Sequence, residues 1–155
     1  MNVFFEFHKI VHKLQKDEIP YALIGGVAMA FHSFARFTQD IDLLIKREGL
    51  EPLSVLLKAQ GYLISAEPWS FENGLELHRF MKGEGEDEMI LDVLVAKTER
   101  QIAVVDQALT AVSEESGTVR VASREDLIWL KSLRNSPMDQ IDIQNLKDES
   151  RDPSN

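Results

Sequence analysis

Asp40 and Asp42 are the residues in this sequence whose type and spacing most clearly suggest chemistry. They alternate with apolar residues in the run Asp40–Ile45, a period-two pattern that indicates a β-strand. The two carboxylates therefore share one face of that strand and repel each other. A divalent cation relieves this repulsion, because Mg²⁺ takes hard oxygen ligands. We expect Asp40 and Asp42 to bind a metal ion, and the alternative is a solvated strand end.

Gly25 and Gly26 lie where a predicted strand passes into a predicted helix. The strand is the apolar run Tyr21–Ile24, and helix-compatible apolar residues follow from 27 to 34. Glycine lets the backbone turn sharply and approach a ligand closely, and the N–H groups at a helix N-terminus favour an anion. The glycine pair and the carboxylate pair together predict a site that binds a metal-bound nucleoside triphosphate. The alternative for the pair is an ordinary glycine turn.

Asp92 lies in the middle of another apolar run, residues 89 to 95, which is typical of a buried strand. A bare charge at such a position is costly to bury, so Asp92 needs a partner or a metal ion. An ion pair with Arg79 or Arg36 would meet that need. The two upstream aspartates favour the other interpretation, in which Asp92 is a third carboxylate of the same site.

These motifs, taken together, resemble the DNA polymerase β-like nucleotidyltransferase superfamily. The resemblance rests on Gly25-Gly26, then Asp40-Ile41-Asp42, then the lone Asp92 on a later apolar strand. Residues 25–45, with the sequence GGVAMAFHSFARFTQDIDLLI, are more narrowly similar to small bacterial nucleotidyltransferases that include AbiEii-type toxins. The similarity extends from about residue 21 to about residue 142.

The resemblance implies transfer of a nucleoside monophosphate from a nucleoside triphosphate, such as ATP, to a hydroxyl group. The acceptor would be an RNA 3′ end, a protein side chain or a small molecule, and Mg²⁺ or Mn²⁺ would be required. Asp40 and Asp42 would bridge two metal ions, Asp92 would complete the metal site on the nucleophile side, and Gly25-Gly26 would hold the β- and γ-phosphates. The alternative is a catalytically idle relative that binds nucleotide or a partner protein, as in a toxin–antitoxin pair.

Other residues are candidates for holding the nucleotide. Many relatives carry a serine after the glycine pair, whereas this chain has Val27, which removes one donor and puts triphosphate binding in doubt. Arg36 and Thr38, just before the aspartate pair, are expected to supply donors instead. Lys131 and Arg134 match a Lys-x-x-Arg pattern of the C-terminal helix in the small relatives. These two residues are interpreted either as phosphate contacts or as a plain pair of surface charges.

Composition narrows the class of protein. The chain has 155 residues, of which 44% are hydrophobic, so we expect one domain over residues 1–147 and a disordered acidic tail over 148–155. No cysteine is present, which excludes disulfides and thiolate chemistry and fits a cytoplasmic location. No apolar run has the length of a membrane span and no signal peptide is evident, so no membrane partner is expected. The net charge of −9 argues against a broad nucleic-acid surface, and no DNA partner is expected.

The order of elements predicts an α/β (α+β) fold, a minimal nucleotidyltransferase fold with a small mixed sheet and helices packed mainly on one face. A domain of this size leaves little room for a separate acceptor-binding domain. We therefore expect the acceptor to be held by a shallow cleft, a second subunit or a partner such as an antitoxin. Trp69 and Phe71 lie in a predicted loop, residues 68–74, and are interpreted as core edge, with a base-stacking platform as the alternative. Helices are predicted over 2–16, 27–34 and 50–60 and from Thr98, Ser123 and Pro137, and strands over 21–24, 40–45, 62–65, 75–81 and 89–95, with short β-like runs at 111–112 and 118–121.

Overall fold

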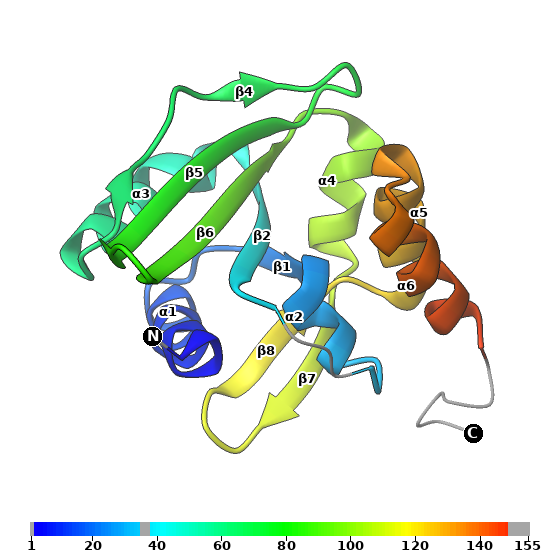
Figure 1. Ribbon diagram of the computed structural model, residues 1–155, viewed down its shortest axis with the longest axis horizontal. Helices are drawn as coiled ribbons and strands as arrows, with labels where there is room; N and C mark the ends of the chain where they lie inside the picture. The colour runs from blue at the N-terminus through cyan, green and yellow to red at the C-terminus, as the bar shows by residue number, and fades with distance from the viewer. Residues whose placement is uncertain (1, 35–37, 149–155) are drawn as a thin grey trace.

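The computed structural model describes residues 2–34 and 38–148, which form a mixed sheet flanked by helices (Figure 1). The strand order is β3-β5-β6-β2-β1-β8-β7, and β4 pairs with β5 beside β3. This confirms the mixed α/β class. The strands are β1 (Tyr21–Ile24), β2 (Asp40–Lys46), β3 (Leu63–Ile64), β4 (Trp69–Ser70), β5 (Glu76–Glu84), β6 (Asp87–Ala96), β7 (Leu109–Ser113) and β8 (Gly117–Val121). The helices are α1 (Val3–Lys16), α2 (Gly25–Ala30), α3 (Leu50–Ala59), α4 (Glu99–Asp106), α5 (Arg124–Arg134) and α6 (Pro137–Lys147), with a 3-10 turn at Arg47–Gly49.

Three strands at the centre of the sheet position the aspartates. β1 runs antiparallel to β2, and β2 runs parallel to β6. A parallel pair needs a long crossover, which α3 and the strands β3 to β5 supply here. Ile41, Leu43 and Ile45 on β2 are fully buried, and α1 packs against both β2 and α3. The apolar half of the alternating pattern on β2 therefore anchors the strand in the core.

Most elements lie where the sequence predicts them, with differences at their ends. α2 begins at Gly25 rather than after the glycine pair, so both glycines belong to its first turn. β5 and β6 extend into the predicted turn 82–88, because their hairpin needs only the two residues Gly85 and Glu86 between the strands. Gly85 has a φ of +60°, a conformation that suits glycine in such a tight turn.

α4 ends at Asp106, and the β-hairpin that follows places Leu109 in β7, where it is 50% exposed. One expectation about packing is wrong. Trp69 and Phe71, interpreted as core edge, are 63% and 40% exposed. Two residues of the predicted loop, Trp69 and Ser70, form the short strand β4. This strand pairs with the edge of β5 that does not contact β6.

α5 and α6 form a helical hairpin at the end of the chain (Figure 1). α5 stops at Asn135, which has the left-handed backbone (φ 53°) that often ends a helix. Ser136 then caps α6, and Pro137 occupies the first turn, as the sequence predicts. In the described parts of the chain, no helix is both long and apolar enough to cross a membrane. The predicted disordered tail falls, after Asp148, outside the described residues.

Candidate active site

Asp40, Asp42 and Asp92 lie on one face of the sheet. Asp42 on β2 is the direct partner of Asp92 on the parallel strand β6, and paired residues of neighbouring strands point the same way. Asp40 precedes Asp42 by two residues and shares its face. Asp40 and Asp42 are half-buried, while Asp92 is buried. The structure thus brings the three predicted site carboxylates together.

The pKa values of Asp40 and Asp42 are raised by their surroundings. Burial raises the pKa of Asp42 to about 7, and the charges of Asp92 and then Asp40 push the pKa in the same direction. Burial, followed by the charge of Asp92, also raises the pKa of Asp40. Arg134 and Lys131 act in the opposite direction on Asp42 without cancelling these effects. Such raised pKa values are expected where carboxylates share a partly desolvated site with no cation bound.

The backbone of Gly25 lies close to the side chain of Asp42. Its φ is +72°, and a Cβ atom at this position would lie 2.8 Å from the Cγ of Asp42. Only glycine meets both conditions. Ile24, the N-cap residue of α2, supplies no side-chain hydrogen bond to the first turn. Val27, which follows the glycine pair, is completely buried and faces the core.

Arg79 on β5 is bound to Asp92. The two residues are register partners on the antiparallel strands β5 and β6. Arg79 donates from Nε to Oδ1 at 2.8 Å and from Nη2 to Oδ2 at 2.9 Å. This pairing raises the pKa of Arg79. The ion pair considered from the sequence is therefore confirmed, and it occurs within the aspartate cluster rather than in place of it.

Thr38 lies just before β2, and its hydroxyl forms hydrogen bonds with the backbone of Asp40. Thr38 Oγ1 donates to the carbonyl of Asp40 at 3.3 Å and accepts from the amide of Asp40 at 3.4 Å. These bonds help to fix the start of β2 beside the carboxylates. The predicted nucleotide contact of Thr38 stays a prediction, and Arg36 lies outside the described residues.

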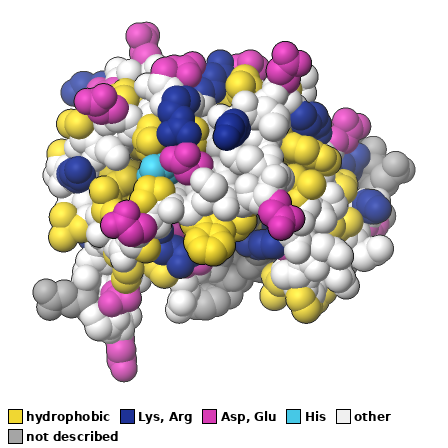
Figure 2. Space-filling view, turned by 90° about the horizontal axis from the view of Figure 1, so that it is seen from above, with side chains coloured by type: hydrophobic (Ala, Val, Ile, Leu, Met, Phe, Trp, Pro, Cys, Tyr) yellow, Lys and Arg dark blue, Asp and Glu magenta, His cyan; other side chains and the backbone are white. Residues whose placement is uncertain are grey.

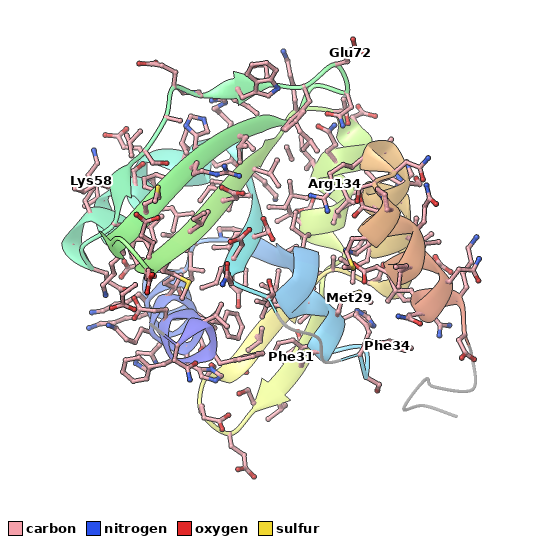
Figure 3. All side chains as sticks on the ribbon, viewed as in Figure 1. Met29, Phe31, Phe34, Lys58, Glu72 and Arg134 are labelled. Atoms are coloured by element: carbon pink, nitrogen blue, oxygen red, sulfur yellow. The ribbon has the colours of Figure 1, made fainter. Side chains whose placement is uncertain are left out.

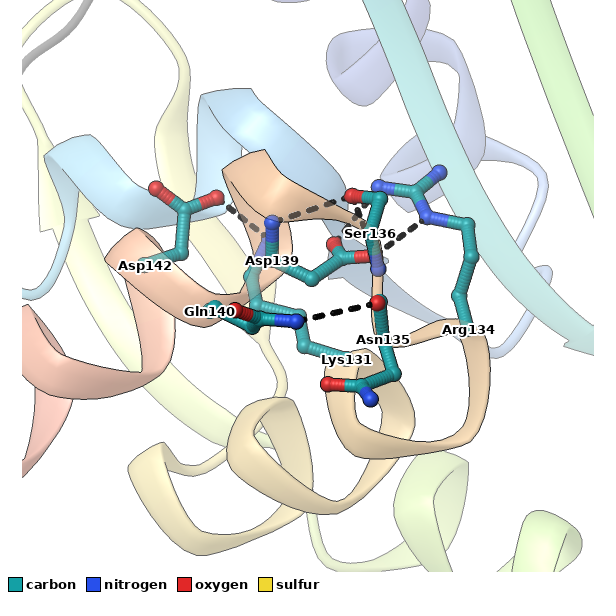
Figure 4. Close-up of polar contacts among 7 residues, drawn as sticks. All are labelled: Lys131, Arg134, Asn135, Ser136, Asp139, Gln140 and Asp142. Atoms are coloured by element: carbon teal, nitrogen blue, oxygen red, sulfur yellow. Dashed lines mark hydrogen bonds and ion pairs between the residues drawn. The ribbon is translucent and has the colours of Figure 1, made fainter.

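The side chain of Lys131, on α5, extends to Asp142 on α6 (Figure 4). The side chain is 5% exposed, and its Nζ is 2.9 Å from Oδ2 of Asp142, which is also buried. The plain surface-charge interpretation of Lys131 is therefore wrong, because the ammonium is inside the protein, and its predicted phosphate contact stays a prediction. Its positive charge still acts on Asp42.

Arg134 differs from Lys131 in being 70% exposed. It points from α5 towards the strands at the centre of the sheet (Figure 3). Arg134 donates from Nε and Nη2 to the two oxygens of Asp139, each at 2.7 Å. Burial would raise the pKa of Asp139, but the bonds from Arg134 and Ser136 hold that pKa at about 2. The capped corner between α5 and α6 therefore fixes a guanidinium near Asp42.

Solved structures show what kind of fold this is. The chain superposes on the crystal structure of ANT(2″)-Ia in complex with adenylyl-2″-tobramycin with a TM-score of 0.63 and 19% identity, covering 92% of this chain and 85% of that one. The lincosamide antibiotic adenylyltransferase LnuA, bound to lincomycin, gives a TM-score of 0.59 and 18% identity over 92% and 95% of the chains. A candidate nucleotidyltransferase, TM1012 from Thermotoga maritima, gives 0.66 and 14% over 89% of each. This chain has a nucleotidyltransferase fold.

The comparisons show the nucleotidyltransferase fold and do not show a narrower family or a substrate. No protein-family model matches the sequence, and no curated protein sequence matches it. At identities below 20%, these likenesses concern architecture and not substrate. The narrower similarity to AbiEii-type toxins stays a prediction from residues 25–45.

The donor chemistry of this nucleotidyltransferase fold suits a hard divalent cation. Carboxylate oxygens are its preferred ligands, and burial together with the neighbouring carboxylates raises the pKa values of Asp40 and Asp42. Across residues 2–34 and 38–148, however, no three His, Cys, Asp or Glu side chains form a ready metal site. Mg²⁺ is usually held by one or two carboxylates together with substrate phosphates rather than by an all-protein cage. The residues present therefore fit a cation that arrives with a triphosphate.

Proposed function

We propose that this protein transfers a nucleoside monophosphate from a nucleoside triphosphate to a hydroxyl group. The observation that carries the proposal is the meeting of Asp40, Asp42 and Asp92 on one face of a nucleotidyltransferase fold, next to the tight turn at Gly25. Two similar structures concern antibiotics, one with adenylyl-2″-tobramycin and one an adenylyltransferase with lincomycin. They support ATP as donor and a small molecule as acceptor, ahead of an RNA end or a protein side chain.

In this proposal, Asp40 and Asp42 hold Mg²⁺ or Mn²⁺, and Asp92 completes the site on the acceptor side. The bound cation would neutralise the triphosphate and the developing charge on its leaving group. The first turn of α2, at Gly25 and Gly26, is where the β- and γ-phosphates approach the backbone. Arg134, fixed by Asp139, adds a positive charge on the same side.

The reaction breaks one bond and forms one bond at phosphorus. The acceptor oxygen bonds to the α-phosphorus, and the bond from that phosphorus to the bridging oxygen of the β-phosphate breaks. Pyrophosphate leaves with the electron pair, and the hydroxyl proton passes to the carboxylate of Asp92. Arg79 is a positioning residue, because its two hydrogen bonds fix the orientation of that carboxylate. Most of the rate enhancement in such transfers comes from positioning and charge neutralisation.

A second candidate function is nucleotide or partner binding without catalysis. Two observations favour it: both oxygens of Asp92 already accept bonds from Arg79, and the residue after the glycine pair is a buried valine. An antitoxin or second subunit as partner, a toxin–antitoxin role and a cytoplasmic location stay predictions from the sequence.

A labelling experiment separates the two functions. The purified protein is incubated with each α-labelled triphosphate, Mg²⁺ or Mn²⁺, and pools of aminoglycosides, lincosamides, total RNA or cell lysate. Transfer of label by the wild type but not by Asp42→Asn supports the proposal, with Glu51→Gln on the exposed surface of α3 as the matched control. Saturable nucleotide binding without transfer to any pool favours the idle protein. The absence of both nucleotide binding and transfer contradicts the enzyme and the idle nucleotide-binding protein, and leaves partner binding alone.

A further inference from the structure

The face of the sheet that carries the aspartates continues across β5 to β4. Strand register establishes this: Leu94 on β6 pairs with Leu77 on β5, and Leu77 pairs with Trp69 on β4. Side chains of directly paired residues share a face, and every second residue along a strand does so too. Leu94 is two residues from Asp92, so Trp69 projects from the same face as Asp92.

This continuation is apolar and partly uncovered. The indole of Trp69 is 63% exposed, and Leu77 and Leu94 are only half-buried. A second apolar row lies two rows away, where Ile90 is the partner of Asp40 and Met81 links it to Leu63, and the row of Asp92 and Arg79 separates the two. We call the row of Trp69, Leu77 and Leu94 the Trp69 wall.

The Trp69 wall carries no charge of its own, and the row beside it presents the guanidinium of Arg79, which is 43% exposed and would repel a cationic acceptor. The row from Leu94 through Leu77 to Trp69 contains no ionisable side chain, and in the row beside it Asp92 is paired with Arg79. Figure 2 shows the molecule from the side on which β4 lies, where hydrophobic side chains lie among scattered charged ones. A polycationic acceptor would find no carboxylate along this row. A flat, uncharged group would find an exposed indole.

We propose that the Trp69 wall binds the acceptor, and that the acceptor carries an uncharged aromatic or apolar ring that packs on Trp69 while its hydroxyl lies at Asp92. Strands are about 4.8 Å apart and rise about 3.3 Å per residue. Trp69 is two strands and two residues along the strand direction from Asp92, so ring and hydroxyl are separated by about 12 Å. The assignment of the hydroxyl rests on the proposed function, whereas the ring contact does not.

The test measures ring binding and transfer separately. In a Trp129→Phe background, Trp69 is the remaining tryptophan, and its fluorescence is titrated with phenyl β-D-glucoside, methyl β-D-glucoside and glucosamine. The phenyl compound is expected to bind about tenfold more tightly than the methyl compound, and glucosamine more weakly than either. Trp69→Ala lacks the fluorophore, so its binding is measured by calorimetry. This variant is expected to show no preference for the phenyl ring. Val112→Ala, an exposed apolar residue on β7, is the control that keeps it.

Label transfer from α-labelled triphosphate to the same glucosides is then measured. A phenyl preference that depends on Trp69, with no transfer to any acceptor, would contradict the proposed function and leave the ring site intact. Transfer at equal rates to phenyl and methyl glucoside, unchanged in Trp69→Ala, would support the enzyme and overturn the Trp69 wall. Equal affinity of wild type and Trp69→Ala for phenyl glucoside also overturns it.

Discussion

Arg79 binds both carboxylate oxygens of Asp92 from the opposite position on the neighbouring strand, at 2.8 and 2.9 Å. Asp92 is buried, while the side chain of Arg79 is 43% exposed. The pair therefore holds the third carboxylate in one orientation beside Asp42 and leaves the guanidinium in contact with solvent. Bidentate geometry of this kind depends on arginine and is not reproduced by lysine.

Arg79→Gln is expected to destabilise the protein by about 1–3 kcal/mol, because it leaves a buried carboxylate without its cation. The exposure of Arg79 keeps the expected loss below that of a fully buried pair. A double-mutant cycle with Asp92→Asn measures the interaction through urea unfolding, and a coupling energy of about 1–2 kcal/mol is expected. Additive effects of the two changes would show that the bidentate contact contributes nothing to stability. Arg79→Lys should recover only part of the loss.

Asp42→Asn is expected to stabilise the protein at high pH. The pKa of Asp42 in the folded state is about 7, above the value of about 3.9 for a free aspartate, so the folded protein holds a proton that the unfolded chain releases. The favourable contribution of this group is fully present below about pH 4 and is lost as the pH rises through 7. In EDTA, the melting temperature of Asp42→Asn should therefore match the wild type near pH 4 and exceed it by roughly 3–8 °C at pH 8.

Thermal unfolding of both proteins from pH 4 to pH 8.5 checks this dependence, with Glu51→Gln as the surface control. Addition of Mg²⁺ at pH 8 should raise the melting temperature of the wild type and leave Asp42→Asn nearly unchanged, because the cation replaces the missing positive charge. A constant difference between the two proteins at every pH would contradict the raised pKa.

Gly25→Ala is expected to be more damaging than the same change at another left-handed glycine. Both Gly25 (φ +72°) and Gly85 (φ +60°) require a conformation that alanine adopts at a cost of about 1 kcal/mol. A Cβ at Gly85 meets nothing within 4 Å, whereas a Cβ at Gly25 would lie 2.8 Å from Cγ of Asp42. The difference in unfolding free energy between the two variants isolates the contact with Asp42. We expect it to exceed 1 kcal/mol, and equal losses would show that Asp42 moves away freely.

Local sequence patterns were sufficient to predict the central strands and the shared face of Asp40 and Asp42. Alternation along one strand decides which residues share a face, and it needs no knowledge of the partner strand. The pairing of Trp69 with Leu77 could not be read in the same way, and Arg79 was one of two candidate partners for Asp92. Both contacts depend on the register between neighbouring strands, which alternation along a single strand does not specify.

The two basic residues of α5 show a similar limit. Lys131 and Arg134 are three residues apart on one helix, and the sequence pattern predicts the same role for both. The structure buries Lys131 against Asp142 and leaves Arg134 at the surface, held by Asp139. The difference arises from the turn at Asn135 and the packing of α6, so it is a tertiary effect that helix periodicity does not contain.

Asp42→Asn and Asp92→Asn are expected to separate nucleotide binding from transfer. Asp42 is placed between Asp40 and Asp92, beside Gly25, so its loss should weaken metal-dependent triphosphate binding and abolish transfer. In the proposed function Asp92 lies on the acceptor side, and the triphosphate would still be held by Asp40, Asp42 and the first turn of α2. Asp92→Asn should therefore retain triphosphate affinity within about threefold while losing transfer by about 10²–10³-fold, the scale seen when a preorganised stabilising group is removed. Affinity by calorimetry and α-label transfer are measured for both variants in one buffer, with and without EDTA. Wild-type transfer by Asp92→Asn would make Asp92 a purely structural partner of Arg79, and undiminished triphosphate affinity in EDTA would remove the cation from the binding step.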